Sequence, residues 1–177
     1  KGNLCRQTYN SMIELTAQEV EKIKDYTERF LKFKRNKPNY KQGGGSDYEY
    51  DRMGFTGEYL VYKYFGREKD FEWEFDKHRR FDDIILKYKN ERDLVVDVKT
   101  SYTGNELRVA KWHIDDGGMY NVDAFILVKV SRDFKSGEVV GIISMERFKK
   151  LAVVKKYNSK CYCLEKGFLS TNLSNLS

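Results

Sequence analysis

The sequence predicts an α/β domain in which a central mixed β-sheet is flanked by helices, with an N-terminal helical arm in front of it. The first observation is a long amphipathic pattern near the N-terminus. The second is a change, from Gly54 onward, to one helical pattern followed by short alternating or apolar segments typical of strands. The third is the length, because 177 residues bury enough surface for one domain without a disulfide or metal to hold it.

The N-terminal pattern predicts a helix over Leu15–Lys34. Thr16-Ala17-Gln18-Glu19 matches the capping box, in which a threonine and a glutamate three residues later satisfy the first free amides of a helix. The glycine cluster Gln42–Ser46 follows, and we interpret it as a flexible linker because no apolar strand precedes it, as a phosphate-binding loop would require. The predicted division is therefore an arm and linker over 1–46 and a domain over 47–177.

Within the domain, one helix is predicted over Phe55–Phe65 and a second, capped by Ser144, over Met145–Leu151. The segment Glu106–Ile114 fits a helix or a strand equally well, and Ser136-Gly137 is interpreted as a turn. The predicted strands are Phe71–Phe75, Phe81–Tyr88, Leu94–Thr100, Val122–Val130, Glu138–Ser144 and a last one within Cys161–Leu169.

Composition restricts the class of protein. The net charge of +6 fits a polyanionic partner, because basic side chains displace the counterions condensed on phosphates, but it equally fits ordinary solubility. No apolar run approaches the ~18 residues of a membrane helix. Three cysteines, an odd number, suggest reduced thiols, so we expect a cytoplasmic, reducing location and no membrane partner. Two histidines without a closely spaced cysteine pair give no convincing zinc site.

Three acidic residues and a lysine stand where chemistry is expected. Side chains alternate along a strand, so Asp97 and Lys99 point to one face and the valines beside them to the other. If the preceding strand pairs as a hairpin, Asp83 arrives at the same end of the sheet, and two convergent carboxylates suit Mg²⁺. Glu58 lies on the apolar stripe of the predicted helix, where an acid is costly to bury without compensation.

This ordered set resembles the PD-(D/E)XK nuclease superfamily, whose pattern is an acid on an early helix, an Asp opening one strand and (D/E)-X-K on the next. Glu58, Asp83 and Asp97-Val98-Lys99 take these places, and the resemblance covers roughly residues 54–130. Asp82 stands where the family often has Pro, which leaves open whether Asp82 or Asp83 is the ligand. We favour Asp83 because the apolar Ile84 follows it directly.

The resemblance implies a restriction-endonuclease-like fold and a Mg²⁺-dependent endonuclease, with Mn²⁺ as a substitute, that cuts DNA in preference to RNA. Glu58, Asp83, Asp97 and Lys99 would be catalytic, and the three acids would hold the metal. The expected nucleic-acid contacts are His78, Arg79 and Arg80, which form a basic cluster near Asp83, together with Ser101 and Lys111. For Trp112, packing in the core or an interface is favoured over base stacking. The enzyme would act as a homodimer or would be directed to its DNA by a partner subunit, and both alternatives stay open.

Two other classes of function remain. A non-catalytic nucleic-acid-binding or assembly module on the same fold would keep the basic surface without turnover. An interaction protein of unrelated α/β fold would leave Glu58, Asp83, Asp97 and Lys99 scattered. The presence of acids and a lysine at all four positions of the pattern favours the nuclease.

Overall fold

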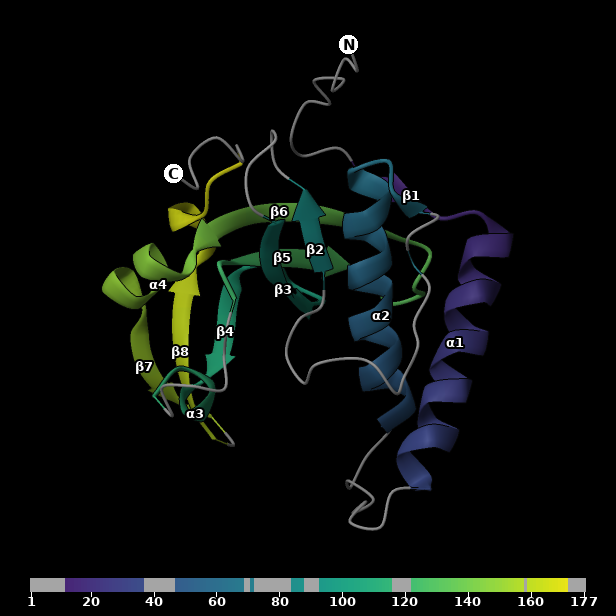
Figure 1. The fold of residues 1–177 in the computed structure, drawn as a ribbon, viewed down its shortest axis with the longest axis horizontal. Helices are drawn as coiled ribbons and strands as arrows, with labels where there is room; N and C mark the ends of the chain where they lie inside the picture. The colour runs from purple at the N-terminus through teal and green to yellow at the C-terminus, as the bar shows by residue number, and fades with distance from the viewer. Residues whose placement is uncertain are drawn as a thin grey trace.

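The structure is a computed structural model that describes residues 12–36, 47–68, 71, 84–87, 93–115, 122–157 and 159–171. These residues form two helices on one side of a five-stranded sheet and a smaller three-stranded sheet on the other side (Figure 1). The predicted coarse class, a mixed sheet flanked by helices, is therefore confirmed.

The larger sheet has the strand order β1-β6-β5-β3-β2. Its strands are β1 (Ile13–Glu14), β2 (Ile84–Lys87), β3 (Asp93–Ser101), β5 (Ala124–Val130) and β6 (Ser136–Ser144). β2 and β3 pair antiparallel, as the predicted hairpin requires, whereas β3 and β5 pair parallel. The chain between these parallel strands forms β4 (Glu106–Ala110) and α3 (Lys111–Asp115), so the ambiguous segment contains one strand and one short helix.

The core lies on both faces of β5. Its side chains alternate between two apolar clusters: Ala124, Ile126 and Val128 pack toward the long helices, whereas Phe125 and Leu127 pack toward the smaller sheet. All five are at most 1% exposed. Burial on both faces explains why this strand is a continuous apolar run in the sequence rather than an alternating one.

Helix α2 (Asp47–Tyr64) covers one face of the larger sheet through Leu60 and Val61, which pack against the valines of β3. Helix α1 (Ala17–Arg35) lies on the outer side of α2 (Figure 1), where Ile23 and Tyr26 pack against Phe55. The predicted capping box of α1 is confirmed in both directions. Because α1 packs on α2, it shares a core with the domain, and the division at residue 46 stays a prediction.

The second sheet, with the order β4-β8-β7, covers the opposite face. It contains β7 (Val153–Lys156) and β8 (Lys160–Glu165), and the short α4 (Met145–Leu151) inserts Phe148 between the sheets. Ser144 caps α4 as predicted, by accepting a hydrogen bond from the Arg147 amide. The predicted last strand is β8, which a 3-10 turn (Lys166–Phe168) follows.

Two sequence-based expectations are corrected. Ser136-Gly137 is not a turn but the start of β6, and the turn lies just before it, where Ser131 and Asp133 bond the backbone. Gly137 is required for space, because a Cβ there would lie 2.4 Å from Leu60 Cδ1. Helix α2 starts at Asp47 rather than Phe55, and its added turns are held by the ion pair between Asp51 and Lys34 of α1, at 2.9 Å. Most of the predicted strand Phe71–Phe75 lies outside the described residues.

No helix in the described part of the chain is both long enough and apolar enough to cross a membrane.

Candidate active site

Asp97 and Lys99 lie side by side on one face of β3. Val96 and Val98 are buried against α2, so the alternation of the strand turns the two charged side chains to the opposite face, as predicted. Lys99 Nζ forms an ion pair with Asp97 Oδ1 at 2.7 Å. The Asp97 side chain is only 3% exposed and that of Lys99 is 26% exposed, so the lysine connects a buried carboxylate with the surface.

The buried carboxylate of Asp97 has few partners. In the part of the chain that the structure describes, no backbone amide or hydroxyl donates a hydrogen bond to either of its oxygens, and Lys99 supplies the compensating charge. A buried carboxylate with most of its acceptor capacity unused is costly to maintain for structure alone. Such a group is suited to binding a cation or a ligand donor.

The pair lies just beyond the residues of β3 that pair with the described strand β2. β2 pairs with Asp93–Val96 only, and Ile84 lies opposite Val96, the residue before Asp97. From Asp97 to Ser101, β3 is paired on its other side with β5, while no strand among the described residues pairs with the β2 side. Both charged side chains therefore follow directly after the last described residue pair of the β2–β3 hairpin.

Glu58 approaches this region from α2. The helix comes very close to β3 at Gly57, where a Cβ would lie 2.2 Å from Thr100 Oγ1. Glu58 is 7% exposed, which confirms that it lies on the buried stripe, and its charge also acts on Tyr26 of α1. Gly57 thus sets the distance at which the glutamate meets the strand.

Glu58 and Lys99 line one cavity of about 600 Å³. The cavity is bounded by α2, the end of β3 and the turn after it, β4, and the loop between β5 and β6. Besides the three predicted site residues that line it (Glu58, Lys99 and Ser101), its wall includes Tyr50, Tyr102, Arg108 and Arg132. Sequence reasoning missed these four, because strands and loops far apart in the chain bring them together.

His113 lies within electrostatic range of the Asp97–Lys99 pair. Burial lowers the pKa of His113, and the charge of Lys99 lowers it further, while Asp97 acts in the opposite direction. Its neighbour Trp112 is 52% exposed, so it is not packed in the core, and packing in an interface stays a prediction.

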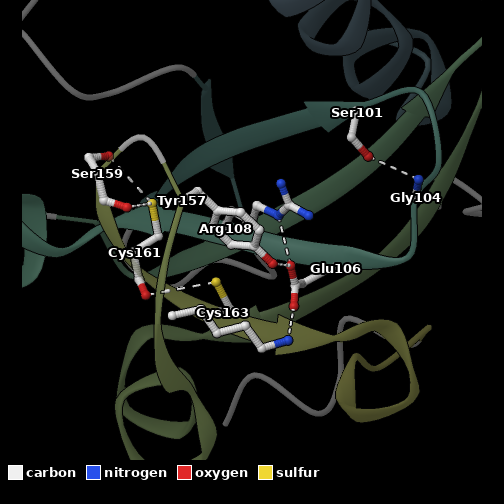
Figure 2. A network of polar contacts seen from close by, with 9 residues as sticks. Ser101, Gly104, Glu106, Arg108, Tyr157, Ser159, Cys161 and Cys163 are labelled. Carbon is white, nitrogen blue, oxygen red and sulfur yellow. Dashed lines mark hydrogen bonds and ion pairs between the residues drawn. The ribbon is translucent and has the colours of Figure 1, made fainter.

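The predicted nucleic-acid contacts are only partly described. Ser101 lines the cavity, and its Oγ accepts a hydrogen bond from the Gly104 amide at 2.9 Å, which shapes the turn after β3 (Figure 2). Lys111 forms an ion pair with Asp115. The remaining predicted site residues, Asp82, Asp83, His78, Arg79 and Arg80, lie outside the described residues.

The described acidic side chains near Lys99 are hard oxygen donors, the kind that Mg²⁺ prefers. Among the described residues there is no group of three or more His, Cys, Asp or Glu side chains that could hold a metal ion. Asp97 and Glu58 are the two predicted ligands in this part of the chain, and the third, Asp83, lies just before its described segment. The described set therefore supplies hard oxygen ligands without by itself completing a site.

Glu106 organises the wall of the cavity opposite α2. Lys155 and Arg108 form ion pairs with its carboxylate, and Tyr157 donates a hydrogen bond at 2.9 Å (Figure 2). Burial alone would raise the pKa of Glu106, but these donors outweigh it and lower the pKa to about 2. The network joins β4 to β7 and holds Arg108 at the cavity.

The stability that this network provides should depend on pH. Since the folded-state pKa of Glu106 lies below its ordinary value of 4.5, the contribution is complete above that value and is lost as the pH falls toward 2. The test is the free energy of unfolding by urea between pH 2 and 6 for wild type and Glu106→Gln. We expect the difference between the two to shrink as the pH falls, and a difference independent of pH would contradict the assignment.

Comparison with protein-family models, curated proteins and solved structures found no match to the chain.

Proposed function

We propose that the chain is a Mg²⁺-dependent nuclease on a restriction-endonuclease-like version of this α/β fold, and that it hydrolyses phosphodiester bonds in DNA. The observation that carries the proposal is the Asp97–Lys99 pair, a buried carboxylate with unused acceptor capacity beside a partly exposed ammonium group. The pair follows directly after the described part of the β2–β3 hairpin. A solvated surface ion pair would give neither the burial nor the unused oxygens.

The residues near the pair fit a hard cation. Asp83 is joined by a peptide bond to Ile84, and Ile84 is the partner of Val96, so one more residue of the same register would bring Asp83 opposite Asp97. Asp83 and Asp97 would then hold Mg²⁺, with Glu58 as a further ligand or as the group that orients a water. Bound there, the ion would polarise the scissile phosphate and lower the pKa of a water molecule.

The chain's own groups would carry the remaining steps. Lys99, the partly exposed member of the pair, donates a hydrogen bond to the phosphate oxygen on which negative charge builds. Asp97 keeps the ammonium group in place through their ion pair. Glu58, which lines the same cavity as Lys99, accepts a hydrogen bond from the attacking water and fixes its direction.

The test uses the purified full chain with plasmid, linear duplex, single-stranded and branched DNA, and with RNA of matched sequence. Each substrate is incubated with Mg²⁺, Mn²⁺ or EDTA. We expect cleavage of DNA with Mg²⁺, retained with Mn²⁺ and abolished by EDTA. Binding that weakens with salt, without cleavage of any substrate under any condition, would instead support the non-catalytic module. A protein that neither binds nor cleaves any of these substrates would contradict every role with nucleic acid.

A further inference from the structure

Arg132 is presented to the cavity by a tightly built loop between β5 and β6. The Ser131 amide bonds the Ser136 carbonyl at 2.9 Å, and the Ser131 hydroxyl donates to Asp133 at 2.6 Å. Phe134 in the same loop has φ +58°, a left-handed conformation that is unfavourable for a bulky residue, and it is 8% exposed. The loop is therefore held in one shape by its own bonds and by the core.

Two arginines flank a pair of aromatic rings beside the cavity, and Arg132 and Tyr102 of this group line it. The Arg132 guanidinium lies 5.2 Å from the centre of the Tyr102 ring. The Tyr102 ring lies 6.2 Å from that of Phe134, over which Arg52 stacks at 4.5 Å. Tyr102 is also oriented by its hydroxyl, which donates to Glu49 at 2.7 Å. Such cation–π contacts fix the planes of the groups before any ligand binds.

Arg132 differs from the other cationic side chains of the cavity in its lack of an acidic partner among the described residues. Lys99 is paired with Asp97, and Arg108 with Glu106. Arg132 is exposed, and no acidic side chain in the described ranges forms an ion pair with it. An exposed guanidinium without an acidic partner, held beside a cavity, favours an anionic ligand such as a phosphate.

Tyr50 also lines the cavity. It lies on α2, is 74% exposed and makes no ring contact with another described residue. A large aromatic side chain exposed to this degree at the mouth of a cavity is typical of a surface that binds a flat partner. Tyr50 and Tyr102, from separate elements, thus line a cavity that is also lined by Arg132, a side chain suited to binding phosphate.

We propose that this cavity binds an unpaired nucleotide, with its base against Tyr50 and Tyr102 and a phosphate on Arg132. The inference rests on the proposed nuclease function and names its substrate class: nucleic acid with a single-stranded end or flap beside the cut. Bases inside a duplex have no free face for a side chain to stack on, whereas every unpaired base does. The volume of about 600 Å³ lies within the range of small-ligand sites and is too small for a double helix.

The experiment measures binding of the full chain to fluorescent DNA in EDTA, at one fixed salt concentration, so that no cleavage occurs. One probe is a blunt duplex, and the other is the same duplex with a single-stranded extension. Tyr50→Ala and Arg132→Gln are compared with the matched variants Phe168→Ala and Arg147→Gln, whose exposed side chains lie away from the cavity. Thermal unfolding checks that each variant folds.

We expect both cavity variants to weaken binding of the extended probe by about tenfold and binding of the blunt probe by less than about twofold. Tyr50→Phe should bind like wild type, because it keeps the ring. Equal losses on both probes, or no loss on either, would overturn the proposal. Mg²⁺-dependent cleavage by wild type is measured separately. Cleavage without a preference for the extended probe would support the nuclease function and contradict the nucleotide site. If the cavity variants lose binding of the extended probe alone and wild type never cleaves DNA, the nucleotide site is supported and the nuclease function is contradicted.

Discussion

An Asp97→Asn variant is expected to lose Mg²⁺-dependent DNA cleavage by at least about 10³-fold while remaining folded. The amide has the shape of the carboxylate but lacks its charge, so it neither holds the cation nor fixes the Lys99 ammonium group at 2.7 Å. The measurement is the single-turnover cleavage rate at saturating Mg²⁺, with circular dichroism to confirm the fold. Cleavage at the wild-type rate by a folded variant would remove Asp97 from the mechanism.

The stability of the pair provides an independent check. In Asp97→Asn the remaining Lys99 is 26% exposed and can reach water, so we expect a loss of less than about 1 kcal/mol. Lys99→Met leaves a carboxylate that is 3% exposed without its compensating charge, so we expect a loss of about 3 kcal/mol. Urea unfolding of the two variants measures this asymmetry, and equal losses would show that the pair is solvated like an ordinary surface ion pair.

Gly57→Ala should destabilise the protein by about 2 kcal/mol and lower the unfolding temperature by about 6 °C. The added Cβ would lie 2.2 Å from Thr100 Oγ1 and 3.1 Å from Thr100 Cβ, so α2 has to move away from β3. This displacement also moves the adjacent Glu58, and we expect cleavage to fall with stability. Thermal unfolding and the cleavage assay measure the two effects.

The same helix offers a matched control. A Cβ at Gly54 would meet nothing within 4 Å, so Gly54→Ala should stabilise the protein by about 0.5–1 kcal/mol through helix propensity alone. Thr100→Ala combined with Gly57→Ala should recover part of the lost stability, because it removes the Oγ1 and Cγ2 atoms of the clash. No recovery in the double variant would show that the cost arises elsewhere.

Local patterns were sufficient for much of the fold. The alternation of β3 predicted which face each of its side chains takes, because successive side chains of a strand point to opposite faces. The apolar run Val122–Val130 predicted a strand, which the structure has as β5 over Ala124–Val130. The capping box of α1 and the Ser144 cap of α4 were predicted from one residue type at one position. Burial of Glu58 followed from its place on a helical stripe.

What the sequence did not predict depends on partners distant in the chain. The first turns of α2 are polar and follow the glycine cluster, and they are held by the ion pair of Asp51 with Lys34. Gly137 suggested a turn, yet it is a strand residue chosen for space against Leu60. The cavity combines residues of α2, β4 and the β5–β6 loop, so no local pattern marks Tyr50, Arg108 or Arg132. Asp83 and the basic cluster near it stay predictions.

The position of β4 in the chain has a consequence for biosynthesis. β4 is made between two strands of the larger sheet, but it hydrogen-bonds with β8 of the other sheet. β8 follows about 50 residues later, which corresponds to several seconds of translation at ordinary rates. Until β8 emerges, the wall that carries Glu106 and Arg108 has no sheet to join, so an incomplete chain still on the ribosome lacks one side of the cavity. The order of the strands therefore delays assembly of the candidate site until the end of the fold has been synthesised.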